Sequence, residues 1–94
     1  MSKVYVRLIY AEKCSDCAQV KQDLERAIEK TEIDCFVEKI LYKHPEAIDL
    51  ALRYKEISDI PCLIIGNGLA IFNGTKYTVE KISNALVKAS KNDS

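Results

Sequence analysis

Two cysteines three positions apart, Cys14 and Cys17, stand where an apolar stretch gives way to a polar, helix-like one. At this spacing two thiols can form a redox dithiol, supply half of a metal site, or lie buried without chemical function. Disulfide exchange requires a thiolate, which a helix N-terminus favours because unpaired backbone N–H groups gather there. The pattern therefore makes Cys14 the candidate attacking thiol and Cys17, one turn further on, the more sheltered resolving thiol.

The charged neighbours of Cys14 act on its thiolate in opposite directions. Lys13 favours the negative charge, whereas Glu12 and Asp16 disfavour it, so the net effect stays open. Lys13 is nevertheless a candidate site residue because it is the cation nearest to Cys14 in the sequence.

The remaining cysteines bear on the metal alternative. Cys35 and Cys62 occur singly, so the four cysteines do not form the two close pairs of a zinc ribbon. Cys35 opens an apolar strand and is predicted to be a small buried hydrophobic residue. Cys62 directly follows Pro61, which leaves two interpretations: a packed core residue, which we favour, or a third thiol near the dithiol.

Periodicity divides the chain into seven predicted elements. We predict strands over residues 3–10, 35–41, 61–66 and 69–72, and helices over residues 15–31, 45–57 and 78 onward. The apolar stripe of the second helix is predicted to contain Ile48, Leu52 and Ile57. Thr78 is predicted to cap the third helix.

The order of these elements, β-α-β-α-β-β-α, predicts an α/β fold. The first strand–helix–strand unit should be parallel, and the last two strands should form an antiparallel hairpin. Helices on both faces of a four-stranded mixed sheet satisfy the layer rules for a chain of this size. We expect a single domain over residues 1–94, with a frayed tail at residues 91–94.

Composition narrows the function classes. The 94 residues include 14 basic and 14 acidic side chains, so the basic excess typical of nucleic-acid binding is missing. Neither a signal peptide nor a membrane-spanning run is evident, which favours a cytoplasmic protein with no membrane partner. We also expect a monomer. Thiols are normally kept reduced in that compartment, so catalytic, metal-binding or core cysteines are expected rather than static disulfides.

Pro61 precedes a predicted buried strand, where it removes a backbone donor from the sheet. Local sequence alone favours an ordinary trans peptide between Ile60 and Pro61, because few X–Pro bonds are cis. Together with Cys14-x-x-Cys17 after the first strand and the order of elements, however, Ile60-Pro61 resembles the thioredoxin-like superfamily, and its short glutaredoxin-like members most closely. The resemblance covers nearly the whole chain.

The resemblance implies roles for individual residues. Cys14 would be the nucleophile, Cys17 the resolving cysteine and Pro61 a cis-proline packed beside them. Ile60 would offer backbone hydrogen bonds to a bound thiol substrate. Lys13 is a further candidate substrate-binding residue, from its place next to Cys14. The implied function is a thiol-disulfide oxidoreductase that acts on protein or small-molecule disulfides, without an organic cofactor, with a reductase or glutathione as electron donor.

The sequence departs from the family pattern at three places. Ser15-Asp16 stands between the cysteines, where common members have a proline, and Lys13 replaces the usual tryptophan of thioredoxins. Gly74 and Thr78 stand where glutaredoxins have a Gly-Gly pair and an acidic residue for glutathione. These departures weaken the case for glutathione, although Lys13 and Lys76 remain candidate partners for its carboxylates. The alternative is a non-enzymatic module that binds a soft metal or senses redox state through the same cysteines.

Overall fold

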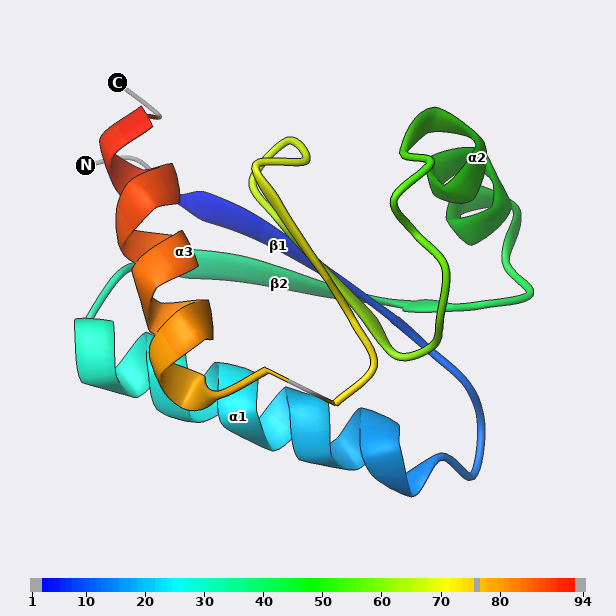
Figure 1. The fold of residues 1–94 in the computed structure, drawn as a ribbon, viewed down its shortest axis with the longest axis horizontal. Helices are drawn as coiled ribbons and strands as arrows, with labels where there is room; N and C mark the ends of the chain where they lie inside the picture. The colour runs from blue at the N-terminus through cyan, green and yellow to red at the C-terminus, as the bar shows by residue number, and fades with distance from the viewer. Residues whose placement is uncertain (1–2, 76, 93–94) are drawn as a thin grey trace.

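The computed structural model describes residues 3–75 and 77–92. Its elements follow the predicted order: β1 (Val4–Tyr10), α1 (Ser15–Thr31), β2 (Cys35–Leu41), α2 (Pro45–Arg53), β3 (Cys62–Ile65), β4 (Ala70–Asn73) and α3 (Val79–Asn92). Figure 1 shows their arrangement. Among the described residues, none of the helices is both long and apolar enough to cross a bilayer.

The four strands form one mixed sheet in the order β2-β1-β3-β4. β1 and β2 run parallel, starting from the pair Val4 and Cys35, whereas β3 is antiparallel to both β1 and β4. The parallel unit and the C-terminal hairpin are therefore confirmed. Ile9 pairs with Cys62 near the end of β1, which brings the start of β3 to the edge of the sheet where the chain turns toward the cysteine pair.

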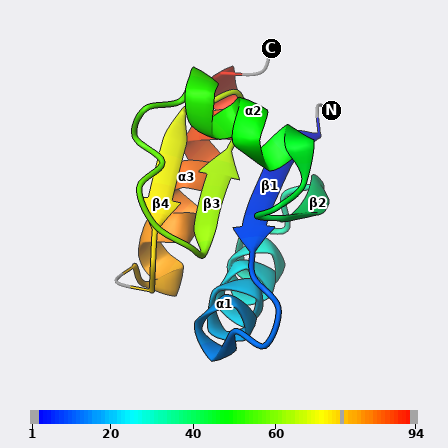
Figure 2. The ribbon, with the colours of Figure 1, turned by 90° about the vertical axis from the view of Figure 1, so that its right-hand side faces the viewer.

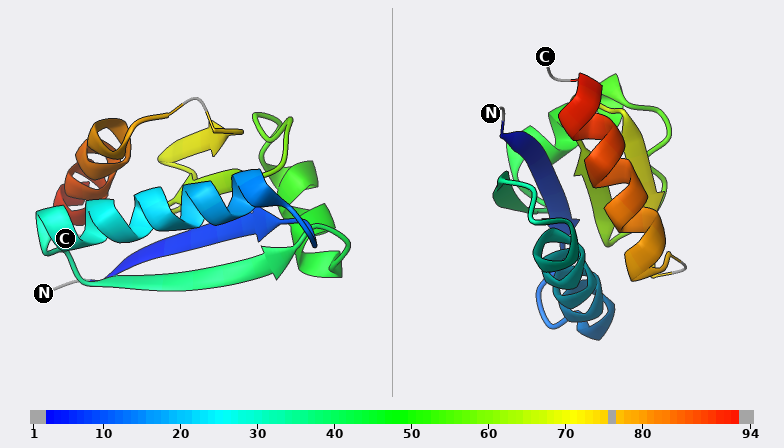
Figure 3. Two further views of the ribbon diagram at one scale, coloured as in Figure 1. Left: turned by 90° about the horizontal axis from the view of Figure 1, so that it is seen from below. Right: turned by 90° about the vertical axis from the view of Figure 1, so that its left-hand side faces the viewer.

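Helices cover both faces of the sheet, as predicted. Helices α1 and α3 lie on one face and α2 lies across the other (Figure 2). Alternate residues of one strand enter the two cores, because side chains of a strand point to opposite faces in turn: Leu8 packs under α1 and α3, whereas Ile9 packs under α2. Seen from below, α2 lies at the end of the sheet toward which β1 and β2 run (Figure 3).

The apolar stripe predicted for α2 is wrong at Ile48 and Leu52, although Ile57, beyond the helix, does pack against the core. Ile48 and Leu52 are 54% and 75% exposed, and Ala47 and Leu50 are the helix residues buried against the sheet. The helix also ends at Arg53. Apolar residues occupy five of the six positions from 47 to 52, so two stripes are compatible with helical spacing, and contact with the sheet selects between them.

This register predicts very different costs for two leucine truncations in α2. Leu50→Ala should lower the free energy of unfolding by about 2–5 kcal/mol, because it leaves a cavity in the core. Leu52→Ala should change it by less than about 0.5 kcal/mol, because the side chain is mostly in water. Urea unfolding followed by circular dichroism compares the two variants. If Leu52→Ala lowered the free energy of unfolding more than Leu50→Ala, the stripe predicted from the sequence would be supported instead.

The third helix confirms the predicted cap at Thr78. The Thr78 side chain accepts a hydrogen bond from the Lys81 backbone N–H at 3.2 Å, as expected of an N-cap. The helix continues to Asn92 and so includes the first two residues of the tail expected at 91–94. Residues 93–94 lie outside the described residues.

Candidate active site

The cysteine pair stands at the first turn of α1. β1 ends at Tyr10, and a short loop in which Lys13 has a left-handed backbone (φ 54°) reverses the chain into the helix. Cys14 is the N-cap residue: its backbone is extended, and its sulfur accepts a hydrogen bond from the Cys17 backbone N–H at 3.1 Å. The predicted position of Cys14 at the helix start is confirmed, so its sulfur lies where the helix dipole favours negative charge.

Cys14 and Cys17 are joined as a disulfide, with their Cα atoms 5.3 Å apart. Cys14 is partly exposed, whereas Cys17 is 6% exposed and lies behind it. The Cys17 sulfur also accepts a hydrogen bond from the Ala11 backbone N–H at 3.5 Å. This difference in exposure suits an attacking thiol at position 14 and a resolving thiol at position 17, which remain predicted roles.

Both cysteines line a cavity of about 350 Å³ with a basic wall. Lys13, Lys21 and Lys39 contribute three cations to its lining, and Glu12 contributes one carboxylate. Opposite charge nearby stabilises a thiolate, and like charge nearby destabilises it. The lining therefore favours a thiolate at this place.

Two of these lysines were missed in the sequence analysis. Lys21 lies four residues after Cys17 on the same helix, so the i,i+4 spacing was available as a signal. Lys39 comes from β2, where its register partner is Leu8 of β1. No local signal places Lys39 beside the cysteines, because only the pairing of β1 with β2 does so.

Ile60 and Pro61 lie at the entry to β3. The peptide bond between them is cis, which confirms the expectation from the family resemblance and corrects the trans bond favoured by local sequence. Pro61 is buried and directly precedes Cys62, whose partner in β1 is Ile9. Pro61 therefore lies at the end of β1 that leads through Tyr10 to the cysteine pair.

Ile60 is placed differently from Lys13. Lys13 lines the cysteine cavity, whereas Ile60 lines a separate cavity of about 260 Å³ along α2, together with Ile48 and Leu52. The Ile60 backbone N–H donates to the Asp59 side chain at 2.8 Å. A substrate carbonyl that binds this N–H, as the resemblance implies, must displace the Asp59 carboxylate.

The two other cysteines belong to the interior to different degrees. Cys62 is fully buried on the α2 face of the sheet, which confirms the core interpretation. Burial, with a smaller contribution from the charge of Asp59, raises the pKa of the Cys62 thiol to about 12. Cys35 is only half-buried, and burial followed by the charge of Asp34 raises the pKa of its thiol. Neither thiol is activated for exchange.

The raised pKa of Cys62 predicts a specific loss of stability in alkali. The folded state keeps the Cys62 proton up to a pH of about 12, whereas the unfolded chain releases it near its ordinary pKa of 9.0. Above the lower value the unfolded state binds fewer protons, so stability falls as pH rises, by on the order of 1 kcal/mol per pH unit. Unfolding titrations from pH 8 to 10.5 should show a shallower decline in Cys62→Ala than in the wild type. If stability declined with pH equally steeply in both proteins, the raised pKa of Cys62 would be contradicted.

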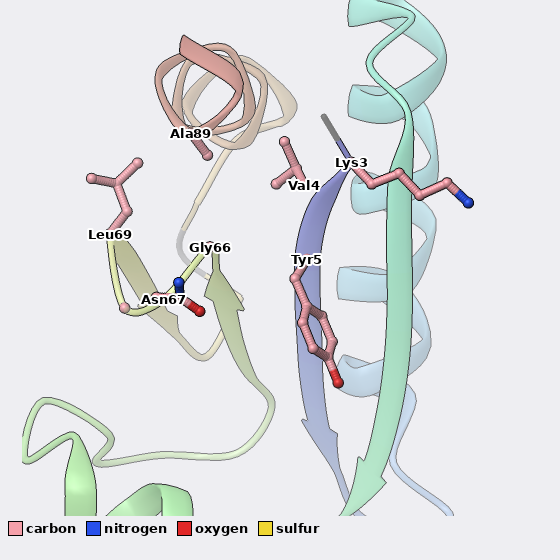
Figure 4. A pocket seen from close by; sticks show the side chains of 8 residues that line it. Lys3, Val4, Tyr5, Gly66, Asn67, Leu69 and Ala89 are labelled. Carbon is pink, nitrogen blue, oxygen red and sulfur yellow. The ribbon is translucent and has the colours of Figure 1, made fainter. Parts of the chain in front are cut away.

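A further cavity, of about 320 Å³, lies at the opposite end of β1. Val4, Leu69 and Ala89 border it, and the Lys3 side chain extends away from it, toward β2 (Figure 4). The seven residues of β1, at about 3.3 Å each, separate it from the cysteine pair. It is therefore not part of the candidate active site.

Two other predictions concern ligands. Lys76, a candidate partner for a carboxylate, lies outside the described residues. Across residues 3–75 and 77–92, no group of three or more His, Cys, Asp or Glu side chains is arranged to hold a metal ion.

No family model matches the sequence, and no curated protein matches it either. Solved structures do match. Thioredoxin-2 of the malaria parasite is 16% identical (TM-score 0.68, 92% of this chain and 82% of that chain). A thioredoxin-like protein from Clostridium perfringens is also 16% identical (TM-score 0.75, covering 93% of this chain and 71% of that chain). The thioredoxin Deadhead from Drosophila melanogaster is 24% identical (TM-score 0.64, covering 92% of this chain and 80% of that chain). The protein therefore has a thioredoxin-like α/β fold, with a Cys-x-x-Cys pair between its first strand and first helix.

Proposed function

We propose that the protein is a thiol-disulfide oxidoreductase of the thioredoxin or glutaredoxin type, with Cys14 as nucleophile and Cys17 as resolving thiol. One observation carries the proposal: the partly exposed sulfur of Cys14 caps α1 and accepts the Cys17 backbone N–H, while the Cys17 sulfur lies buried within bonding distance behind it. This arrangement supplies a stabilised attacking thiolate and an intramolecular second thiol, which are the two requirements of dithiol exchange.

The reaction begins with the reduced protein. The Cys14 thiolate attacks one sulfur of a substrate disulfide; the new S–S bond forms as the old one breaks, and the departing thiolate takes a proton from water. The Cys17 thiol then loses its proton and attacks the Cys14 sulfur, which releases the second substrate thiol. The substrate gains two electrons, and the protein is left with the Cys14–Cys17 disulfide, the state the structure describes.

Regeneration requires an external dithiol or thiol donor. We propose a reductase or glutathione for this step, and protein or small-molecule disulfides as substrates, with no organic cofactor and in the cytoplasm. The three lysines around the cysteine cavity support an acidic partner, because opposite charge accelerates encounter and fixes orientation. Gly74 and Thr78, in place of the glutathione-binding pattern, support a reductase over glutathione.

A thiol-trapping redox titration tests the proposal. The protein carries Cys35→Ala and Cys62→Ala, is equilibrated in dithiothreitol buffers, and is alkylated and weighed by mass spectrometry, because it has no tryptophan to report the change optically. Cys14 and Cys17 should oxidise together as one two-electron couple, and the protein should reduce insulin with dithiothreitol. A potential near about −270 mV indicates a thioredoxin-like reductant, and one near about −200 mV indicates glutaredoxin-like duty. Thiols that never pair, or that react only after a chelator is added, contradict the proposal.

A further inference from the structure

The Asn73 side chain holds the loop that precedes the cis-proline. Asn73 is the last residue of β4, and its side-chain oxygen accepts the backbone N–H groups of Ser58 and Asp59 at 3.0 and 3.3 Å. Its side-chain nitrogen donates to the Glu56 carbonyl at 2.8 Å. One amide thus satisfies three backbone groups of residues 56–59, a segment that belongs to no helix or strand. Figure 2 shows this segment running from α2 past β4 into β3.

The loop held by Asn73 leads directly into Ile60 and Pro61. A second contact holds the chain directly after Ile60. The Gly74 backbone N–H donates to the Pro61 carbonyl at 2.7 Å. In the ladder Asn73 itself is paired with Cys62. The chain is therefore held just before Ile60 by the Asn73 side chain and at Pro61 by the backbone of Gly74, the residue that follows β4.

We propose that Asn73 is a positioning residue that sets the Ile60–Pro61 backbone for binding a peptide next to the substrate disulfide. The inference rests on the proposed function, and it concerns recognition rather than the reactivity of the Cys14 sulfur. The backbone groups of an exposed loop lose little by bonding to water instead, so the Asn73 contacts act mainly by holding the loop in one conformation. A substrate that pairs with the Ile60 backbone benefits from this preorganisation.

The residue type fits the task. Asparagine carries an acceptor and a donor on one short planar group, which allows it to receive two N–H groups and to donate to one carbonyl at once. Aspartate keeps the acceptor and loses the donor to Glu56, and alanine loses both. These three side chains therefore form a graded series at one position.

Steady-state kinetics on two disulfides tests the inference. Insulin presents its disulfides within a peptide backbone, whereas bis(2-hydroxyethyl) disulfide has no backbone to pair with Ile60. Asn73→Ala should raise KM for insulin by about tenfold, because the loop is no longer held in the conformation that binds the peptide, and kcat should stay within about twofold. KM and kcat for the small disulfide should not change. Asn73→Asp should fall between the wild type and Asn73→Ala.

Controls separate positioning from stability. Asn67→Ala replaces an exposed asparagine in the β3–β4 turn and should match the wild type on both substrates. Assays are run at a temperature where circular dichroism shows every variant folded, and the Cys14 alkylation rate should be equal in all of them. An unchanged insulin KM, or an equal decline on both disulfides, overturns the inference and leaves the proposed function standing. A wild-type protein that reduces neither disulfide overturns the proposed function and the inference with it.

Discussion

Replacing Cys14 by serine is expected to abolish disulfide reduction and leave the fold in place. The serine hydroxyl does not ionise near neutral pH, so the attack on a substrate sulfur has no nucleophile, and insulin turnover should fall below about 0.1% of the wild-type rate. The fold should survive because serine is among the best N-cap residues and can accept the same Cys17 N–H that the Cys14 sulfur accepts. The measurement is the initial rate of insulin reduction with dithiothreitol, with melting curves of both proteins.

Cys35→Ser provides the matched control for this result. Cys35 is half-buried and opens β2, where its register partner is Val4 at the end of β1 farthest from the cysteine pair. Its replacement should leave the rate of insulin reduction within about twofold of the wild type. If Cys14→Ser retained full turnover and Cys17→Ser lost it, the two proposed roles would be exchanged.

The sequence predicted the position of the cysteine pair because the signals for it are local. The change from strand to helical periodicity and the place of Cys14 before Ser15 are both properties of adjacent residues. The relative exposure of the two thiols followed from the helix alone, since Cys17 lies one turn inside it and on the same side as Val20 and Leu24. Such features depend on no contact between distant segments.

The features that the sequence missed depend on contacts between segments. The buried stripe of α2 was mispredicted because the helix has apolar residues around most of its surface, and only the sheet beneath it distinguishes Leu50 from Leu52. Lys39 reaches the cysteine cavity through the pairing of β1 with β2. The bonds of Asn73 to residues 56–59 join groups 14 to 17 positions apart, and an Asn-Gly pair in the sequence indicates only a turn.

The cis peptide bond between Ile60 and Pro61 was neither predicted from local signals nor missed altogether. Local sequence favours trans, because that is the usual state of such bonds, whereas the resemblance to the thioredoxin-like superfamily implies the cis bond that the structure shows. The correct expectation therefore came from the family resemblance and not from the residues around Pro61. Ile60 lines the separate cavity along α2 rather than the cysteine cavity, and its neighbours in the sequence could not predict this place.

Cys17→Ser is expected to trap the protein in a mixed disulfide with its substrate. Cys14 can still attack, and the intermediate then persists because no other thiol is placed to resolve it. Cys62 is fully buried on the opposite face of the sheet, with its pKa raised to about 12, and Cys35 opens β2, where it pairs with Val4 at the end of β1 farthest from the cysteine pair. Most of the variant should therefore migrate as a covalent complex after reaction with a protein disulfide in the absence of added thiol.

Non-reducing electrophoresis and mass spectrometry detect this complex, and dithiothreitol should reduce its disulfide and release the two proteins. The double variant Cys14→Ser/Cys17→Ser is the control, and it should form none. A complex that cleared as fast in Cys17→Ser as in the wild type would show that another thiol resolves it, and Cys62 would then have to leave the core to do so. Because that movement would expose a fully buried side chain, the trapped complex also tests how firmly β3 and α2 stay packed during the reaction.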